Sequence, residues 1–227
     1  MIPEFRHEDK FCLSMAEYNL IRQKIKRLLP KDTHARAGYY WVRSLYFENY
    51  RFGSFNDKLD GIGERYKYRL RMYDNDSNSI KFEVKIKKGE YVRKKVLKVD
   101  EREARAIIDN DFSILLKRKM ETEYADIILN QFKALMIVDY KREPFIYKPC
   151  GLRITFDSDL SAGQYPDKFF HNKAAEMPLA VESPVIMELK YSDWLPGWLT
   201  DLIRSDIGTR RSISKYCLGF PNPAVFR

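Results

Sequence analysis

The sequence of 227 residues has few of the residues that mark specialised protein classes. Its three cysteines, Cys12, Cys150 and Cys217, are odd in number and widely separated, which argues against a disulfide framework and against a zinc site. The longest clear apolar run, 134–138, falls far short of the roughly 18 residues that span a bilayer. The first residues carry charges where a signal peptide needs an apolar stretch. We therefore expect a soluble protein of a reducing compartment, the cytoplasm, without direct membrane insertion.

Motifs of the common nucleotide-binding and hydrolytic sites are also missing. The sequence contains no GxGxxG, no GxxxxGK[ST] and no nucleophile elbow. The three histidines, His7, His34 and His171, lack the spacing of metal ligands, and we expect structural or surface roles for them. Any chemistry must therefore come from other residue types.

Positive charge is what the sequence has in excess. It carries 41 Lys and Arg against 32 Asp and Glu, a formal net charge of +9. That balance fits nucleic acid, a membrane surface or a phosphate-rich small molecule. Residues 64–98 contain twelve basic and five acidic residues, so most of the excess lies in one segment. Because 44% of the residues are hydrophobic, the chain can bury a core, and we expect one folded domain over 1–227.

Hydrophobic periodicity predicts an α+β fold. Ser14 and Glu17 form a capping box for a helix that runs to Leu29. Alternation with period two predicts strands at 40–47, 65–73, 80–87, 91–99, 136–142, 151–157 and 184–190. Further helices are expected near 100–109, 121–133 and 197–205, and a short one opened by 212–215. The least periodic stretch, 158–183, predicts a long loop. Many strands with non-adjacent helices indicate an antiparallel sheet or barrel with helices packed outside.

Most of these strands carry a basic face opposite an apolar one. Because side chains alternate strictly along a strand, one face of 65–73 carries Arg65, Lys67, Arg69 and Arg71. A solvated sheet face can be basic, but it usually mixes signs, because like charges directly opposite each other cost roughly 0.2–1 kcal/mol. If the sheet closes with its helices outside, the basic faces line an interior. Such an interior is stable only around a multiply charged anion, such as a triphosphate.

Carboxylates recur on the same faces in a Glu-x-Lys pattern. The pattern occurs three times, as Glu8 with Lys10, Glu83 with Lys85, and Glu188 with Lys190. An acid among so many cations either offsets a cation or binds Mg²⁺ or Mn²⁺, which share oxygen ligands with substrate phosphates. We therefore predict a metal at these three glutamates.

Eight blocks of the sequence, in order, resemble the VTC domain, the polyphosphate polymerase domain of vacuolar transporter chaperone proteins and their bacterial relatives. The resemblance covers residues 4–219, and its blocks are RHEDKF (6–11), VRSLYFEN (42–49), YRLRMY (68–73), FEVKIKK (82–88), DYKREPF (139–145), LRITFD (152–157), VIMELKY (185–191) and SISKYCLG (212–219). This family belongs to the triphosphate tunnel metalloenzymes. The resemblance implies an antiparallel β tunnel in which a divalent metal, Mn²⁺ or Mg²⁺, helps to bind a nucleoside triphosphate or a phosphate chain.

The resemblance also implies roles for individual residues. It places catalytic cations at Lys10, Arg69, Arg71, Lys85, Arg142 and Arg153. It places substrate-binding residues at Lys87, Arg93, Lys95, Tyr140, Lys190, Ser214 and Lys215, with the register among Arg93, Lys94 and Lys95 left open. It assigns the metal to Glu188, to which the Glu-x-Lys pattern adds Glu83 and Glu8.

The resemblance implies transfer of the γ-phosphoryl group of ATP to a growing polyphosphate chain. Hydrolysis of triphosphates in the same tunnel and binding of phosphate chains without turnover remain alternatives. Nucleic-acid binding would require exposed aromatic residues beside the cations, whereas here they alternate to the opposite face. Expected partners are therefore ATP or another nucleoside triphosphate and polyphosphate or pyrophosphate, with a separate membrane protein as a further option.

Overall fold

The computed structural model describes residues 6–172, 174–179, 183–192, 194–206 and 210–220. Its strands are β1 (Arg6–Leu13), β2 (Tyr40–Glu48), β3 (Glu64–Tyr73), β4 (Lys81–Lys88), β5 (Tyr91–Lys98), β6 (Lys133–Tyr147), β7 (Leu152–Gly163), β8 (Met177–Pro178) and β9 (Val185–Tyr191). Its α-helices are α1 (Met15–Leu28), α2 (Gly53–Leu59), α3 (Glu101–Ile108), α4 (Ser113–Lys117), α5 (Glu121–Leu129), α6 (Gly197–Asp206) and α7 (Lys215–Gly219).

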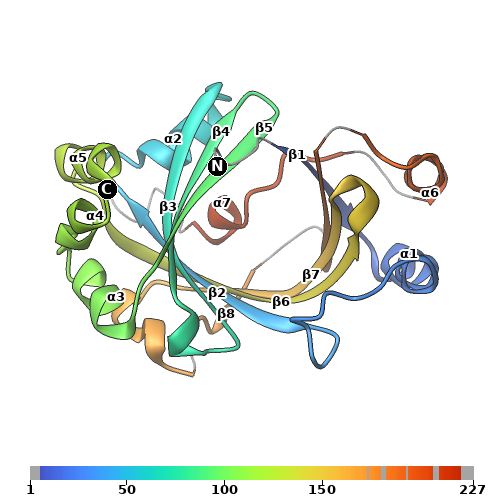
Figure 1. The fold of residues 1–227 in the computed structure, drawn as a ribbon, viewed down its shortest axis with the longest axis horizontal. Helices are drawn as coiled ribbons and strands as arrows, with labels where there is room; N and C mark the ends of the chain where they lie inside the picture. The colour runs from blue at the N-terminus through green and yellow to red at the C-terminus, as the bar shows by residue number, and fades with distance from the viewer. Residues whose placement is uncertain (1–5, 173, 180–182, 193, 207–209, 221–227) are drawn as a thin grey trace.

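The strands form one antiparallel sheet that closes on itself. Their order is β6-β2-β3-β4-β5-β1-β9-β7, and a further pairing of β6 with β7 completes the ring, while the short β8 adds to β7. Figure 1 looks into this ring, with α3, α4 and α5 on one side and α1 and α6 on the other. The closed ring confirms the expected tunnel architecture.

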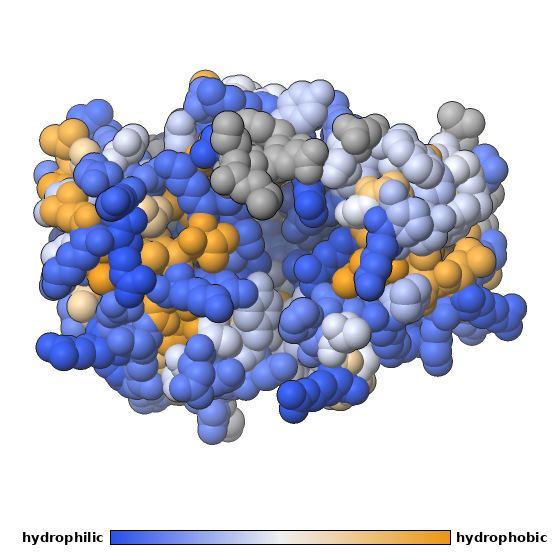
Figure 2. All heavy atoms as spheres, in the orientation of Figure 1, coloured by the Kyte–Doolittle hydropathy of each residue, from blue (hydrophilic) through white to orange (hydrophobic). Residues whose placement is uncertain are grey.

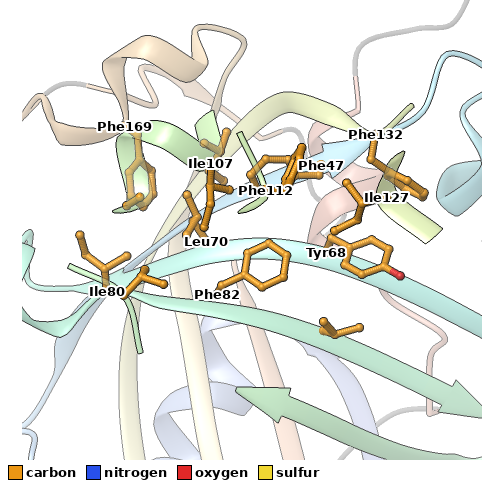
Figure 3. Packing of buried hydrophobic residues seen from close by; sticks show 14 of the residues in the cluster. Phe47, Tyr68, Leu70, Ile80, Phe82, Ile107, Phe112, Ile127, Phe132 and Phe169 are labelled. Atoms are coloured by element: carbon orange, nitrogen blue, oxygen red, sulfur yellow. The ribbon is translucent and has the colours of Figure 1, made fainter. Parts of the chain in front are cut away.

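One apolar core lies between the sheet and helices α3, α4 and α5. The outward residues of β3 and β4, such as Leu70 and Phe82, are fully buried against Ile107 and Phe112. Figure 3 shows these side chains meeting over the strands. Burying a large apolar side chain contributes about 1.5–3 kcal/mol, so this core can hold the outer faces while the opposite faces stay polar.

A second core lies beneath α1 and α6 on the other side of the ring. Ile21 and Ile25 of α1 are fully buried and pack with outward residues of β1, β7 and β9. The predicted capping box is present, because the Ser14 hydroxyl accepts from the Glu17 amide and Glu17 accepts from the Ser14 amide at 2.7 Å. No helix among the described residues is long and apolar enough to cross a membrane.

Helix α7 lies inside the ring, in contrast to the other helices (Figure 1). Its Tyr216 is buried with inward residues of β2 and β6, including Tyr46 and Met136. The expectation that helices pack outside the sheet therefore holds for the helices of the two outer cores, and α7 is the exception. The reason is that the inward faces of β2, β6 and β7 carry an apolar patch that a short helix can cover.

Most predicted elements are confirmed, with the largest difference in the stretch predicted as a loop. Strand β7 continues to Gly163, a 3-10 helix follows at Pro166–Phe170, and β8 lies beyond it. The side chain of Arg43 fixes this segment from outside, since it donates to the carbonyl oxygens of Phe169, His171 and Asn172. The short helices α2 and α4 were not expected, because neither is long enough to show helical periodicity.

Candidate active site

Four cavities run through the ring and share lining residues from one to the next. Their volumes are about 290, 70, 390 and 800 Å³. The first and second share Lys10, Lys67, Lys85 and Ser214, and the second and third share Arg69, Arg71, Lys85, Arg142 and Lys190. The third and fourth share Tyr40, Tyr73 and Arg153. We call this continuous space the tunnel. Figure 2 shows hydrophilic side chains around the hollow at the centre of this face.

Cations dominate the two middle cavities. Two carboxylates, Glu8 and Glu188, stand there against eleven basic side chains, namely Arg6, Lys10, Lys67, Arg69, Arg71, Lys85, Lys94, Arg142, Arg153, Lys190 and Lys215. The inward faces of β1, β3, β4, β6, β7 and β9 supply most of them, as strand alternation requires. The interior therefore carries a large positive excess.

Glu83 anchors the cations of β3 and β5. Arg69 donates to Glu83 Oε2 from Nε at 2.8 Å and from Nη2 at 2.6 Å, and Lys94 donates to Oε1 at 2.7 Å. Burial disfavours the Glu83 carboxylate, yet the surrounding cations outweigh burial and hold its pKa far below the usual range. Arg71 lies next to this pair and donates to Ser44 Oγ at 3.0 Å and to the Tyr140 hydroxyl at 3.1 Å.

A second charge cluster joins β1, β4 and β9. Glu8 lies 2.9 Å from Lys10 Nζ and 2.6 Å from Lys85 Nζ, and Glu188 lies 3.2 Å from Lys190 Nζ. Burial and the nearby Glu8 carboxylate both raise the pKa of Glu188, but the surrounding cations outweigh them and lower it to about 2. Burial lowers the pKa of Lys85 to about 7, although Glu8 opposes that change.

Helix α7 is tied to the tunnel wall by polar contacts. Lys215 Nζ lies 2.6 Å from Asp157 Oδ2, and the Tyr216 hydroxyl donates to the buried carboxylate of Glu48. Ser214 caps the helix and also accepts from Lys67 Nζ at 3.1 Å. Burial lowers the pKa of Lys67.

Arg153 marks the passage from the third cavity to the fourth. Its Nη2 donates to Asp32 Oδ2 at 2.9 Å and to the Tyr40 hydroxyl at 2.7 Å. Its Nε is buried and has no hydrogen-bond partner among the described residues. Since a buried donor without a partner is costly, this atom is suited to an anion.

The structure places two predicted substrate ligands away from the tunnel. Arg93 and Lys95 lie on the outer face of β5, where Lys95 pairs with Glu123 of α5. Lys94 is the residue of β5 that faces inward, because its neighbour on the same face, Val92, also lines the tunnel. The open register among the three cations is thereby resolved in favour of Lys94, and the assignment of Arg93 and Lys95 is corrected.

The other predicted residues come together around the tunnel. Besides the groups described above, Lys87 lines the first cavity with Lys58, Arg65 and Arg211. Sequence reasoning did not assign roles to Lys67 and Asp157. Lys67 follows the alternation of Arg65 and Arg69, so that signal was available, whereas the ion pairs of Asp157 depend on the closure of β7 on β6.

The structure reduces the three predicted metal-binding glutamates to two that could bind one ion together. No three side chains of His, Cys, Asp or Glu lie close enough to hold a metal ion among the described residues, so Glu8, Glu83 and Glu188 do not form one metal site. Both oxygens of Glu83 are occupied by cations. Glu8 and Glu188 lie on neighbouring strands and share Lys10, at 2.9 and 3.6 Å. Two carboxylates completed by substrate phosphate oxygens fit the usual protein ligation of Mg²⁺, and Mn²⁺ accepts the same donors.

Comparisons with solved structures identify the same fold. The structure of HpAC1 from Hippeastrum, a putative adenylyl cyclase described as having a dominant triphosphatase activity, aligns with a TM-score of 0.58 and 14% identity, over 95% of this chain and 94% of that one. The PH1819 protein from Pyrococcus horikoshii OT3 aligns with a TM-score of 0.50 and 12% identity, over 94% and 97%. No curated protein matches the sequence.

The sequence itself matches a family model. The model is that of the VTC domain, and the match runs over residues 5–221, which includes every strand of the ring and helix α7. The chain therefore belongs to the VTC domain family.

Proposed function

We propose that this protein transfers the γ-phosphoryl group of ATP to a polyphosphate chain inside the tunnel. The observation that carries the proposal is the continuous cationic lining of the four connected cavities. A phosphate chain has a charge on every phosphoryl group, and inward residues two positions apart on a strand are roughly 6.6 Å apart. Successive cations can thus contact successive phosphoryl groups.

The central arginines are the groups suited to the reacting phosphate. Arg69, Arg71 and Arg142 lie in the two middle cavities, and guanidinium groups bind phosphate oxygens through paired hydrogen bonds. Phosphoryl transfer depends mainly on positioning and on neutralising charge. Each charge-assisted hydrogen bond contributes about 1.5–3 kcal/mol, so three arginines can supply a large part of the transition-state stabilisation.

Glu8 and Glu188 are the residues that would hold Mn²⁺ or Mg²⁺. Such an ion, when bound, neutralises charge on the transferring phosphoryl oxygens. Lys10 and Lys190 lie against the same carboxylates and keep them ionised.

The acceptor in this proposal is a phosphate and needs no general base. The pKa values of Glu8 and Glu188 are lowered by their cations, against the opposing effect of burial, which makes both carboxylates poor proton acceptors. A terminal phosphate of a polyphosphate chain arrives already ionised. Glu8 and Glu188 are therefore not suited to act as general bases, and a phosphate acceptor requires none.

A second candidate is hydrolysis of a triphosphate in the same tunnel. The aligned HpAC1 protein is described as having a dominant triphosphatase activity. Binding of polyphosphate without turnover is a third possibility, since the same lining would hold the chain.

One experiment separates these candidates. The purified protein is incubated with ATP and Mn²⁺, with and without a short polyphosphate primer, and the products are resolved by gel electrophoresis and phosphate release. Chains longer than the primer support the polymerase, whereas free phosphate alone supports the hydrolase. Tight binding of triphosphate without either product supports a binding protein. The Arg71→Ala variant is the control, because any activity that it retains in full does not arise in the tunnel.

A further inference from the structure

Two buried polar atoms without a hydrogen-bond partner lie two residues apart on β7. They are Thr155 Oγ1 and Arg153 Nε, two of the three such side-chain atoms among the described residues. Thr155 is only 2% exposed, and its neighbours Ile154 and Phe156 point into the outer core. Because side chains alternate along a strand, Thr155 faces the tunnel. A buried hydroxyl without a partner is costly, so Thr155 is a candidate for a role in binding.

Arg142 and Glu188 meet over the inward face of β7. This strand lies between β6, which carries Arg142, and β9, which carries Glu188. Arg142 Nη2 nevertheless reaches Glu188 Oε2 at 3.4 Å, so the contact crosses β7. The strand register places Thr155 directly opposite Glu188 on β9. It places Asp157 opposite Arg142 on β6. The Glu188 side chain is therefore directed toward β7, where Thr155 is its cross-strand neighbour.

The Glu188 carboxylate is held more loosely than the other carboxylate beside Thr155. Its contacts with the three cations around it measure 3.2, 3.4 and 3.6 Å. The oxygens of Asp157, the next inward residue of β7, lie 2.6 and 2.7 Å from their cationic partners. A carboxylate offers about four lone-pair positions to donors. Glu188 can therefore accept a further hydrogen bond, and Thr155 has one to donate.

A hydroxyl has an effect on this carboxylate that a lysine or arginine does not have. A cation beside Glu188 offsets the negative charge that attracts a metal ion, whereas a hydroxyl donates a hydrogen bond and leaves that charge in place. The threonine side chain also has a single torsion between backbone and oxygen, and β-branching restricts it. Thr155 can thus orient the carboxylate from a fixed position on the strand without neutralising it.

The burial of Thr155 separates this role from direct contact with substrate. Glu188 lines the second cavity of the tunnel, whereas Thr155 is absent from the lining of all four cavities. A phosphate in the tunnel would therefore meet Glu188 and the cations around it and would not reach the hydroxyl. The position is that of a residue that acts through its neighbour.

We infer that Thr155 is a positioning residue for the metal-binding carboxylate, and that its hydroxyl donates to Glu188 and orients it toward a divalent cation. This inference rests on the proposed function, in which Glu8 and Glu188 hold the cation, and it adds a residue outside the ligand set. Groups that hydrogen-bond to a metal ligand typically contribute about tenfold to 100-fold to metal affinity. Thr155 should therefore affect metal-dependent binding of phosphates and leave metal-free binding unchanged.

The test measures tripolyphosphate binding by calorimetry, once with EDTA and once with saturating Mn²⁺. Thr155→Val keeps the shape of the side chain and removes the hydroxyl. In EDTA its affinity should stay within about twofold of that of the unaltered protein, and in Mn²⁺ it should fall by roughly tenfold or more. Thr155→Ser retains the hydroxyl and should restore most of the affinity in Mn²⁺. The matched control is Thr200→Val in α6, whose hydroxyl donates to the Pro196 carbonyl oxygen at 3.3 Å, and it should change neither affinity.

Thermal denaturation of each variant separates positioning from structural support. Thr155→Val should unfold at the same temperature as the unaltered protein or at a higher one, because a methyl group replaces a buried hydroxyl that has no partner. A clear fall in its unfolding temperature would assign the hydroxyl to the fold and overturn the inference.

The remaining outcomes contradict the inference in distinguishable ways. If Thr155→Val binds tripolyphosphate as the unaltered protein does in both conditions, Glu188 needs no support from Thr155, while the proposed function stands. Equal losses in EDTA and in Mn²⁺ would mean that the hydroxyl serves the phosphate and not the metal carboxylate. If Mn²⁺ does not change tripolyphosphate binding by the unaltered protein, the metal assignment of the proposed function fails and this inference fails with it.

Discussion

Arg142 on β6 and Asp157 on β7 form a two-point ion pair inside the ring. Arg142 Nε donates to Oδ1 at 2.6 Å and Nη2 donates to Oδ2 at 2.7 Å. Asp157 is fully buried and also lies 2.6 Å from Lys215 Nζ of α7. A single carboxylate thus links the strand pairing that closes the ring, a candidate phosphate ligand and the internal helix.

Replacement of Asp157 by Asn should destabilise the protein strongly. The substitution removes the carboxylate that pairs with Lys215 and the nearer of the two carboxylates beside Arg142, which keeps only Glu188 at 3.4 Å. Removal of one partner from a buried ion pair costs about 3–5 kcal/mol. Urea denaturation followed by circular dichroism measures the loss. The matched control is Asp126→Asn, outside the ring, where the carboxylate accepts from the Tyr68 hydroxyl. Equal losses in the two variants would contradict a special role of Asp157.

The ionised Asp157 carboxylate should also make the free energy of unfolding fall as the pH becomes acidic. Burial disfavours its charge, but Arg142 and Lys215 outweigh burial and hold the pKa of Asp157 well below the usual value of about 3.9. The unfolded chain therefore binds this proton first as the pH falls. The contribution is fully present above the unfolded pKa and is lost as the pH falls toward the lower folded pKa. Denaturation midpoints at pH 6, 4 and 3 should fall less steeply in Asp157→Asn than in the unaltered protein, and parallel curves would count against this explanation.

Two adjacent lysines of β5 should differ in their effect on phosphate binding. Lys94 faces the tunnel beside Glu83, whereas Lys95 faces outward and pairs with Glu123. Lys94→Ala should weaken tripolyphosphate binding by roughly tenfold or more, since a hydrogen bond to a charged group contributes about 1.5–3 kcal/mol. Lys95→Ala should leave binding within twofold. Calorimetric titration of both variants tests the difference. A larger loss of affinity in Lys95→Ala than in Lys94→Ala would contradict the assignment of Lys94 to the inner face of β5.

Substitution of Glu188 should impair metal binding, whereas substitution of Glu83 should reduce the stability of the fold. Glu188→Gln removes a carboxylate of the candidate metal pair and should raise the Mn²⁺ concentration needed for half-maximal turnover by at least roughly tenfold. Glu83→Gln leaves Arg69 without its partner and should lower the denaturation midpoint instead, with the metal requirement unchanged. A metal requirement that moves only in Glu83→Gln would reject this assignment.

Several features could be predicted from particular residues. Ser14 and Glu17 predicted the start of α1, because the capping box is a local interaction. The alternation of Arg65, Lys67, Arg69 and Arg71 predicted which side chains share a face, and all four line the tunnel. Within 91–98, where cations occupy three consecutive positions, alternation allows two registers. The tertiary structure shows which face is inside, because Leu97 packs on the outer core while Val92 and Lys94 line the tunnel.

The periodicity of the strands, the helix caps and the concentration of positive charge on single faces follow from the sequence, because they depend on residues close together in the chain. Three features appear only in the tertiary structure, namely the closure of β6 on β7, the position of α7 inside the ring, and the approach of Glu8 and Glu188 to the same lysine, Lys10. These features bring together residues far apart in the chain, and no local periodicity records which distant strands pair. Closure is what turns basic faces, which could have been solvated, into the lining of a tunnel.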